Sequence, residues 1–189
     1  MARPTRRALL LATPLLLAAA PVARGHDFRF DNIEGGAIDL AEWRGKPMLV
    51  VNTASFCGYA KQFSALQKLH ERYGPRGLLV LAVPSNDFNQ ENPDANAIKD
   101  FCEETWGVQF PMAAPVHVKG PEAHPFFAWA AAQSVAPRWN FYKYLVSRDG
   151  RLLQAFPSNT EPDSASMRQA IEAALSARDP GRARQPATG

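Results

Sequence analysis

The chain has 189 residues, 46% of them hydrophobic, which predicts one domain that buries roughly 70% of the surface its unfolded chain exposes. Its net charge of +3 depends on the first 25 residues, which hold four arginines and no acid, and the remaining 17 basic and 18 acidic residues leave a net charge of −1. A near-neutral chain has no electrostatic basis for binding nucleic acid or an anionic membrane, so these function classes are set aside.

The N-terminal segment has the three parts of a secretory signal peptide. Arginines at positions 3, 6 and 7 precede an apolar run over residues 8–20, and Ala23-Arg24-Gly25 follows as a small-residue cleavage site. A membrane-spanning helix takes about 20 apolar residues, so we expect cleavage instead of a retained anchor. The sequence therefore predicts a leader over residues 1–25 and a mature chain that starts at His26, in the periplasm or secreted. Residues 5–10 also resemble a twin-arginine signal, and the export route stays open.

The first half of the mature chain alternates strands with a helix. A hairpin is expected over residues 27–33 and 37–40, with Glu34-Gly35-Gly36 as its turn. Residues 46–53 and 77–84 are continuous apolar runs, typical of buried parallel strands. Between them, apolar residues recur at helical spacing over residues 60–73, and Gly74-Pro75 ends the helix. This β-α-β order predicts a right-handed crossover.

The second half adds three helices and a hairpin. Helices are expected over residues 94–106, 124–133 and 163–177, and strands over residues 141–147 and 152–156, joined by an Asp-Gly turn. The tail over residues 179–189 is rich in Pro, Gly and Arg and is expected to be disordered. One domain therefore covers residues 26–178. Lys61 and Lys143 are expected to be solvated, and His117 and His124 to have ordinary structural or surface roles.

Cys57 follows directly on the apolar run over residues 46–53. This context predicts a thiol at a strand-to-helix turn, where N–H groups and the positive end of the helix dipole favour a nucleophilic thiolate. Gly58 allows close backbone approach, and Ser55 can supply a polar contact. The alternative is a small buried hydrophobe, which most free cysteines are.

Five segments in order resemble the glutathione peroxidase family. Residues 51–58 read Val-Asn-Thr-Ala-Ser-Phe-Cys-Gly, similar to the family's Val-Asn-x-Ala-Ser-x-Cys-Gly, and residues 139–146 read Trp-Asn-Phe-Tyr-Lys-Tyr-Leu-Val, similar to its Trp-Asn-Phe-x-Lys-Phe-Leu-Val. The loop over residues 84–92, the Phe-Cys to Pro-Met segment over residues 101–112, and Ala-His-Pro-Phe at residues 123–126 also match. The chain is identified on these motifs as a member of that family.

The resemblance implies a thioredoxin-like α/β fold, with a central mixed sheet flanked by helices and an N-terminal hairpin. The element order leads to the same fold. The resemblance also implies a thiol peroxidase that reduces hydrogen peroxide or organic hydroperoxides through a sulfenic acid on Cys57.

Three residues match the family's other catalytic positions: Gln90, Trp139 and Asn140. Two amides and an indole donate hydrogen bonds without carrying charge, which suits a site that must stabilise a thiolate and polarise a peroxide. The loop before Gln90 is one residue shorter than the family's, so Asn89 could take the amide position instead. Taken singly, each of the three would have a structural role.

Cys102 resembles the resolving cysteine of the two-cysteine, thioredoxin-dependent branch of the family. This implies a Cys57–Cys102 disulfide, re-reduced by a thioredoxin-like protein or by glutathione. The alternative is a buried core thiol, because Ile98, Phe101 and Cys102 share one helical face. The segment over residues 120–139 lacks the insertion that tetrameric members use, which implies a monomer.

No cofactor or metal is expected, because two cysteines 45 positions apart have no companion Cys or His at zinc-ligand spacing. A thiol–disulfide oxidoreductase is one alternative function, although Ala60 stands where a CxxC motif places its second cysteine. A peroxide sensor or partner-binding module is another.

Overall fold

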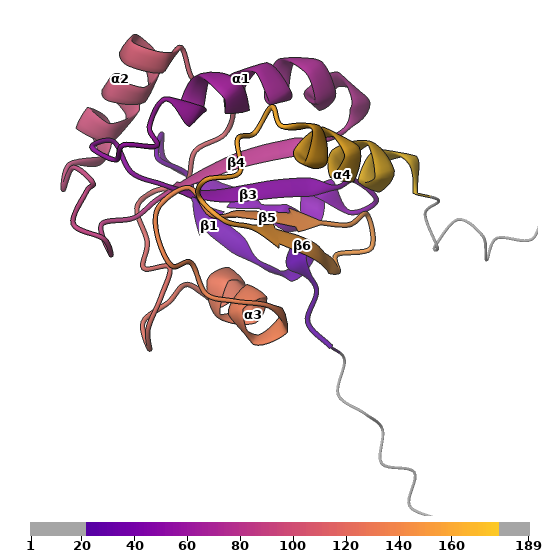
Figure 1. Ribbon diagram of the computed structural model, residues 1–189. Coiled ribbons are helices and arrows are strands. Elements are labelled where there is room, and N and C mark those ends of the chain that lie inside the picture. The colour runs from indigo at the N-terminus through magenta and orange to yellow at the C-terminus, as the bar shows by residue number, and fades with distance from the viewer. Residues whose placement is uncertain (1–21, 178–189) are drawn as a thin grey trace, which may run out of the picture.

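A four-stranded mixed sheet organises the chain in the computed structural model, which describes residues 22–177. The strand order is β4 (Leu79–Pro84), β3 (Met48–Thr53), β5 (Lys143–Val146) and β6 (Leu152–Phe156). β3 pairs parallel with β4 and antiparallel with β5, and β5 pairs antiparallel with β6. A separate hairpin of β1 (Arg29–Asp31) and β2 (Ala37–Asp39) lies beneath the sheet (Figure 1).

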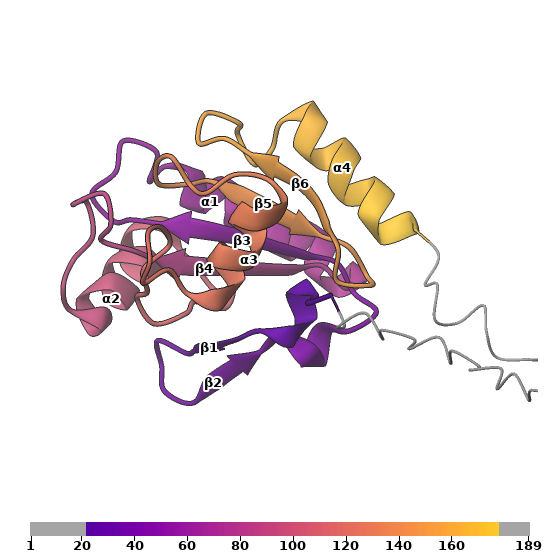
Figure 2. The same ribbon diagram turned by 90° about the horizontal axis from the view of Figure 1, so that it is seen from below.

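Helices cover both faces of the sheet. α1 (Gln62–Tyr73), α2 (Ala95–Trp106) and α4 (Ala165–Ser176) lie on one side, and α3 (Pro125–Gln133) lies on the other with the hairpin (Figures 1 and 2). Alternate residues of β3 enter two separate cores, with Leu49 and Val51 facing α1, and Met48 and Val50 facing α3. All six residues of β3 are buried, which explains the apolar run over its first four residues, 48–51.

Local sequence signals fix the helix ends. The side chains of Asp94 and Ser164 cap α2 and α4 by accepting main-chain N–H groups of Ala97 and Met167. The imidazole of His124 accepts the N–H of Phe126 at the start of α3. Beyond α2, Gly107 adopts a left-handed conformation with φ of 67°, which ends the helix.

Residues 23–27 are fastened to the body of the domain. The indole N–H of Trp129 donates to the Ala23 carbonyl at 2.9 Å, and the N–H of Gly25 donates to the Gly150 carbonyl at 2.7 Å. Gly25 lies so close to β5 that an added Cβ would come within 2.7 Å of Val146. The described part of the expected leader, residues 22–25, therefore contributes to the packing of the domain.

The expected thioredoxin-like α/β class is confirmed, and each expected strand and helix of the mature chain is present. Several boundaries differ: β1 and β2 are shorter than expected, α1 begins at Gln62 instead of residue 60, α4 at Ala165 instead of residue 163, and β5 at Lys143 instead of residue 141. Within residues 22–177, no helix is long and apolar enough to cross a membrane. Most of the expected leader and the expected disordered tail lie outside the described residues.

Candidate active site

Cys57 lies in the turn between β3 and α1, with 6% of its surface exposed. Its sulfur accepts the main-chain N–H of Tyr59 at 3.5 Å. α1 begins at Gln62, two residues after its expected start at residue 60, and single turns lead from the Cys57 turn into it. Because a helix dipole acts mainly within the helix's first turn, the hydrogen-bond donor that contacts the sulfur here is the local N–H of Tyr59 and not the start of α1.

The loop after β4 brings Gln90 beside the Cys57 turn. The N–H of Phe56 donates to the Gln90 carbonyl at 2.9 Å, and the side-chain amide of Asn140 donates to the Gln90 Oε1 at 3.0 Å. Asn89 instead is exposed and adopts a left-handed conformation with φ of 55°. Gln90, and not Asn89, is therefore the amide that meets Asn140.

Trp139 precedes Asn140 in the turn that leads into β5. Its ring packs against Phe88 with centroids 5.3 Å apart, and 41% of the residue is exposed. Asn140 is fully buried, and its Oδ1 has no hydrogen-bond partner among the described residues. The structure thus gathers Gln90, Trp139 and Asn140 from two loops at the end of the sheet where β3 and β4 finish.

Asn52, the next-to-last residue of β3, holds this turn. Its side-chain amide donates to the Trp139 carbonyl at 3.1 Å, and its Oδ1 accepts the N–H of Tyr142 at 3.0 Å. Its main chain also bonds the turn on both sides, accepting the N–H of Phe141 at 2.6 Å and donating to the Tyr142 carbonyl at 3.2 Å. One fully buried asparagine therefore anchors the segment that carries two of the expected site residues.

The anchored turn includes a strained residue. Phe141 has φ of 62°, a left-handed conformation that is unfavourable for a bulky side chain and costs on the order of 1–3 kcal/mol. It is fully buried against Phe63 of α1, with the ring centroids 5.2 Å apart. Such strain persists only where surrounding contacts hold it.

Cys102 lies on α2 and is fully buried, and both cysteines are free thiols. Burial first, and then the negative charges of Glu91 and Glu103, raise the pKa of the Cys102 thiol to about 12. Both cysteines belong to the same buried cluster, and the rings of Phe56 and Phe101, which precede them, are 6.1 Å apart. In this conformation Cys102 is a protonated core thiol near the Cys57 turn.

Glu91 is a buried carboxyl group that the sequence motifs left without a role. Its Oε1 accepts the N–H groups of Ser55 at 3.1 Å and Asn92 at 2.8 Å, which ties the two site loops together. Its Oε2 and the Ser55 hydroxyl have no partner that meets hydrogen-bond geometry among residues 22–177. Burial raises the pKa of Glu91, and the hydrogen bonds from Ser55 and Asn92 partly offset that shift.

Asp87 turns away from the cysteine. It accepts the N–H groups of Val118 at 2.6 Å and Lys119 at 3.1 Å, and pairs with His117 at 2.6 Å. Burial opposes its charge, but the hydrogen bonds from His117, Val118 and Lys119 outweigh burial and lower the pKa of Asp87. This side chain therefore fixes the loop that carries Gln90 to a neighbouring loop.

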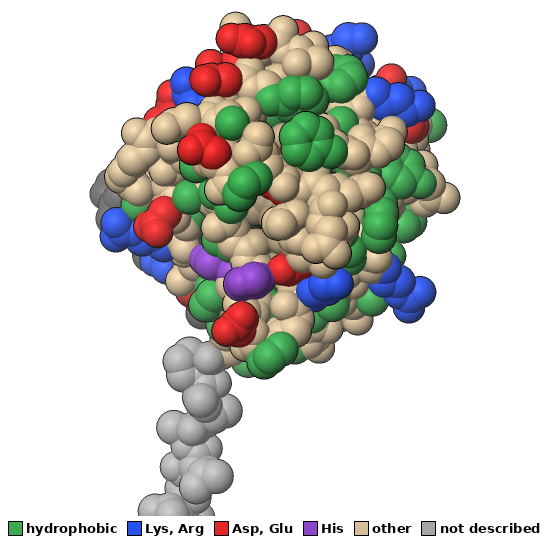
Figure 3. All heavy atoms as spheres, turned by 90° about the vertical axis from the view of Figure 1, so that its left-hand side faces the viewer, with side chains coloured by type: hydrophobic (Ala, Val, Ile, Leu, Met, Phe, Trp, Pro, Cys, Tyr) green, Lys and Arg blue, Asp and Glu red, His purple; other side chains and the backbone are tan. Residues whose placement is uncertain are grey.

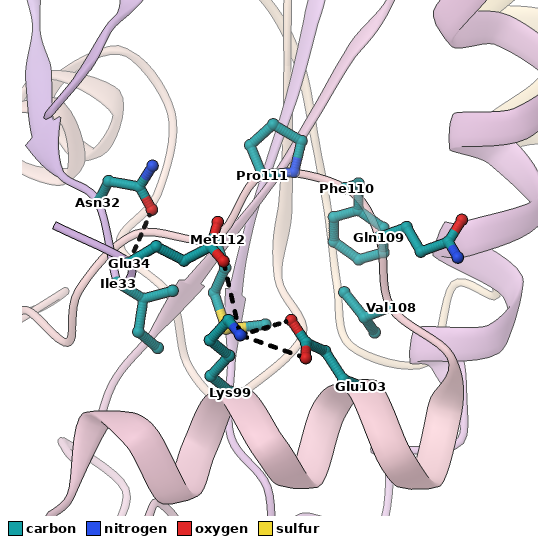
Figure 4. Close-up of a pocket in the computed structure, with 10 residues that line it drawn as sticks. All are labelled: Asn32, Ile33, Glu34, Lys99, Glu103, Val108, Gln109, Phe110, Pro111 and Met112. Atoms are coloured by element: carbon teal, nitrogen blue, oxygen red, sulfur yellow. Dashed lines mark hydrogen bonds and ion pairs between the residues drawn. The ribbon is translucent and has the colours of Figure 1, made fainter. Parts of the chain in front are cut away.

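A hollow of about 210 Å³ lies beside α2, between the tip of the β1–β2 hairpin and residues 108–112 (Figure 4). Lys99 of α2 lies at its rim and pairs with Glu34 of the hairpin at 3.5 Å and with Glu103 at 3.1 Å. Neither Cys57 nor Gln90, Trp139 or Asn140 lines it. The hollow is therefore separate from the cysteine site.

At the end of the molecule that carries the loops, charged side chains lie mainly towards the edge of the face (Figure 3). Hydrophobic side chains are spread over the middle of this face (Figure 3), and Phe56 and Trp139 are 61% and 41% exposed. Among the described residues, no cluster of three or more His, Cys, Asp or Glu has an arrangement suited to a metal ion. Exposed aromatic rings therefore stand next to Cys57 and Asn140 in the sequence.

Sequence reasoning missed the supporting residues Asn52, Glu91, Ser158 and Lys143. Lys143, expected to be solvated, is fully buried, whereas Lys61 is exposed. The signal for Asn52 was present, since a polar residue in a continuous apolar strand must find buried partners. Ser158 and Glu91 lie in loops, where sequence alone gives no sign of burial.

Comparison with known proteins gives one family for the profile match and for the relatives. The sequence profile described as glutathione peroxidase matches residues 26–131. The chain is 39% identical over 150 residues to the hydroperoxy fatty acid reductase gpx1 of Synechocystis sp., covering 73% of this chain and 89% of that protein. It is 43% identical over 156 residues to human glutathione peroxidase 7, covering 79% and 83%.

Solved structures agree on the fold. The crystal structure of Trgpx in its apo form aligns with a TM-score of 0.67 at 28% identity, covering 85% of this chain and all (100%) of that one. A thiol:disulfide interchange protein of the thioredoxin family from Chlorobium tepidum aligns with a TM-score of 0.62 at 15% identity, covering 84% and 99%. The second likeness concerns the fold alone.

Replacing Asn52 with Ala should lower the free energy of unfolding by about 2–4 kcal/mol, because two buried main-chain groups of the 139–142 turn lose their partners. Thr53→Val is the matched control, since the buried Thr53 hydroxyl has no partner and its loss should cost less than about 1 kcal/mol. Urea unfolding followed by tryptophan fluorescence measures both. Equal losses in the two variants would contradict the anchoring role of Asn52.

Proposed function

The chain belongs to the glutathione peroxidase family and is a thiol peroxidase, and from that premise we propose that Cys57 is the residue that reduces the peroxide. The observation that supports this most directly is the position of its sulfur, which accepts the Tyr59 N–H at the loop end of the sheet. The adjoining loops carry Gln90 and Asn140, whose side chains are in contact. Neutral donors of this kind suit a thiolate and a polarised peroxide.

In the proposed first step, the Cys57 thiolate attacks one oxygen of the hydroperoxide. The O–O bond breaks, and the leaving oxygen takes up a proton and departs as water or an alcohol. The sulfur becomes a sulfenic acid, oxidised by two electrons. The amides of Gln90 and Asn140 and the indole of Trp139 stabilise the charge that develops on sulfur and oxygen.

In the proposed second step, Cys102 resolves the sulfenic acid. Its sulfur bonds to the Cys57 sulfur, the S–O bond breaks, and the thiol proton leaves with the hydroxyl as water. Of the α2 residues, only Ile98 and Cys102 are buried, and the exposed ion pair between Lys99 and Glu34 adds little stability. Local opening of α2 can therefore bring Cys102 to Cys57.

The proposed reductant is a thioredoxin-like protein or glutathione, which returns two electrons and two protons to the disulfide. The proposed substrate is hydrogen peroxide or an organic hydroperoxide. The exposed rings of Phe56 and Trp139 favour an apolar peroxide, and one relative is named a hydroperoxy fatty acid reductase. The protein is proposed to act as a monomer.

Export through a cleaved leader is also part of the proposal, with the mature protein in the periplasm or secreted. Cleavage after Gly25 would remove the bonds that Ala23 and Gly25 make to Trp129 and Gly150. A start upstream of Ala23 would keep them.

Cys57→Ser should abolish peroxide reduction with either a thioredoxin-like donor or glutathione, because a hydroxyl is too weakly acidic to replace the thiolate. Steady-state assays with hydrogen peroxide and an organic hydroperoxide measure this, and circular dichroism checks the fold. Cys102→Ser is the matched thiol control and should still consume one equivalent of peroxide. Turnover near the wild-type rate in Cys57→Ser would remove the proposed mechanism.

Cys102→Ser should stop turnover with a thioredoxin-like donor after one equivalent of peroxide, since the sulfenic acid forms but is not resolved. Mass spectrometry should then show Cys57 as sulfinic or sulfonic acid at high peroxide, whereas the wild type shows a Cys57–Cys102 disulfide. If the variant cycles normally with that donor, Cys102 is a core residue and the enzyme works with one cysteine.

The native protein should lack its leader, and intact-mass measurement after expression in a bacterium that exports it should show a mature start near His26. A start at Val22 or Ala23 would place the cleavage earlier and preserve the contacts to Trp129. A native protein that retains residues 1–25 would contradict cleavage.

A further inference from the structure

Lys143, the first residue of β5, is a buried lysine for which the peroxidase chemistry has no direct use. The residue is fully buried. Its Nζ donates to the carbonyl of Ser158 at 3.1 Å and to that of Thr160 at 2.7 Å. Removing an amine from water is costly unless it finds partners, so these two bonds fix the loop over residues 158–160 against β5.

Ser158 connects this lysine to the candidate active site. Its carbonyl also accepts the side-chain amide of Gln62 from the first turn of α1, at 2.8 Å. Its hydroxyl donates to the Asn140 carbonyl at 2.6 Å, and the Asn140 amide donates to Gln90 at 3.0 Å. A continuous chain of hydrogen bonds thus runs from Lys143 through Ser158 and Asn140 to Gln90.

We propose that Lys143 is a positioning residue for Asn140: it holds the 158–160 loop so that the Ser158 hydroxyl fixes the Asn140 carbonyl and aims its amide at the peroxide site. The proposal rests on the proposed function, in which Asn140 donates a hydrogen bond to the reacting atoms.

The turn over residues 139–142 needs the contact from Ser158 in addition to those from Asn52. Asn52 holds the Trp139 carbonyl and the N–H of Tyr142, but it makes no bond to the main-chain carbonyl of Asn140. That carbonyl is bound by Ser158 and stands directly before the strained Phe141. Two anchors therefore hold the turn from opposite sides, and only the one through Ser158 acts on Asn140 itself.

The charge of Lys143 adds a measurable property to this anchor. Burial lowers the pKa of Lys143 to about 7, and the negative charge of Glu161 opposes that shift. The other groups that face Lys143 are Gln62 on α1 and the strand partners Val51 and Phe156, and they are uncharged.

The protonation state of Lys143 changes the strength of its hydrogen bonds. The ammonium form predominates below pH 7 and makes the stronger, charge-assisted bonds. Because the pKa of Lys143 is lower in the folded protein than in the unfolded chain, its burial cost is fully present below pH 7 and is relieved as pH rises above it.

The test measures the rate constant for oxidation of Cys57 by hydrogen peroxide in the wild type and in Lys143→Met across pH. The ratio of the two rates at each pH isolates the effect of the Lys143 substitution. Wild type should exceed the variant by about tenfold near pH 6 and by less than about threefold near pH 9. A ratio near one, or one that does not change with pH, overturns the proposal.

A second variant tests whether Lys143 acts on Asn140 through Ser158. Ser158→Ala breaks the hydrogen-bond chain between Lys143 and Asn140, so the wild-type rate divided by the Ser158→Ala rate should also fall with rising pH. Adding Lys143→Met to Ser158→Ala should change the rate by less than about twofold. Additive losses would overturn the route through Ser158. Ser158→Ala also carries the test if Lys143→Met does not fold.

Two controls separate the possible failures. Leu145→Ala removes a buried side chain from the same strand and should lower stability while leaving the oxidation rate near that of wild type. Asn140→Ala tests the proposed function. If Asn140→Ala oxidises at the wild-type rate, the assigned role of Asn140 fails. If Asn140→Ala is slow and Lys143→Met is not, only the positioning role of Lys143 fails.

Discussion

The candidate active site depends on the buried contact between Asn52 and the turn over residues 139–142. β3 is one of the two inner strands of the sheet and leads to the Cys57 turn. Asn52 links it through side chain and main chain to the turn before β5. Because the Cys57 turn and the Trp139-Asn140 turn adjoin neighbouring strands at the same end of the sheet, the bonds of Asn52 fix the second turn to the strand that carries the first. The left-handed Phe141 is tolerated because the turn is held on both sides.

The two cysteines occupy different environments. In the proposed reaction, Cys57 lies in a turn that is held in place, and Cys102 lies on a helix that opens. Cys57 lies in a turn bonded to the Gln90 loop, and Glu91 ties the same two loops together. Cys102 lies on a helix that buries only two side chains, and its pKa is raised by burial to about 12. A thiol that is protonated and inaccessible at rest does not react with peroxide, so opening of α2 would control when it becomes a nucleophile.

The fold could be predicted from the sequence because its signals are local. Continuous apolar runs marked β3 and β4, and apolar residues at helical spacing marked α1. The start of β5 was placed two residues early because Phe141 and Tyr142 look like strand residues, whereas Asn52 holds them in a turn. Lys143 is expected in water because lysines usually are exposed. Its buried ammonium group is bound by carbonyls of the loop over residues 158–160, and the sequence gives no sign of this contact.

The shortened loop before Gln90 shows why the site residues themselves were easier to name than to place. The loss of one residue left open whether Asn89 or Gln90 takes the amide position. Asn89 adopts a left-handed conformation, which asparagine tolerates better than most residues, and its N–H closes a tight turn on the Asn86 carbonyl at 2.9 Å. That turn shortens the path, and Asp87 fastens it to residues 117–119. Gln90 therefore contacts Asn140 despite the missing residue. The carboxylate of Asp87, which could have opposed a thiolate at Cys57, instead binds residues 117–119 and holds the loop.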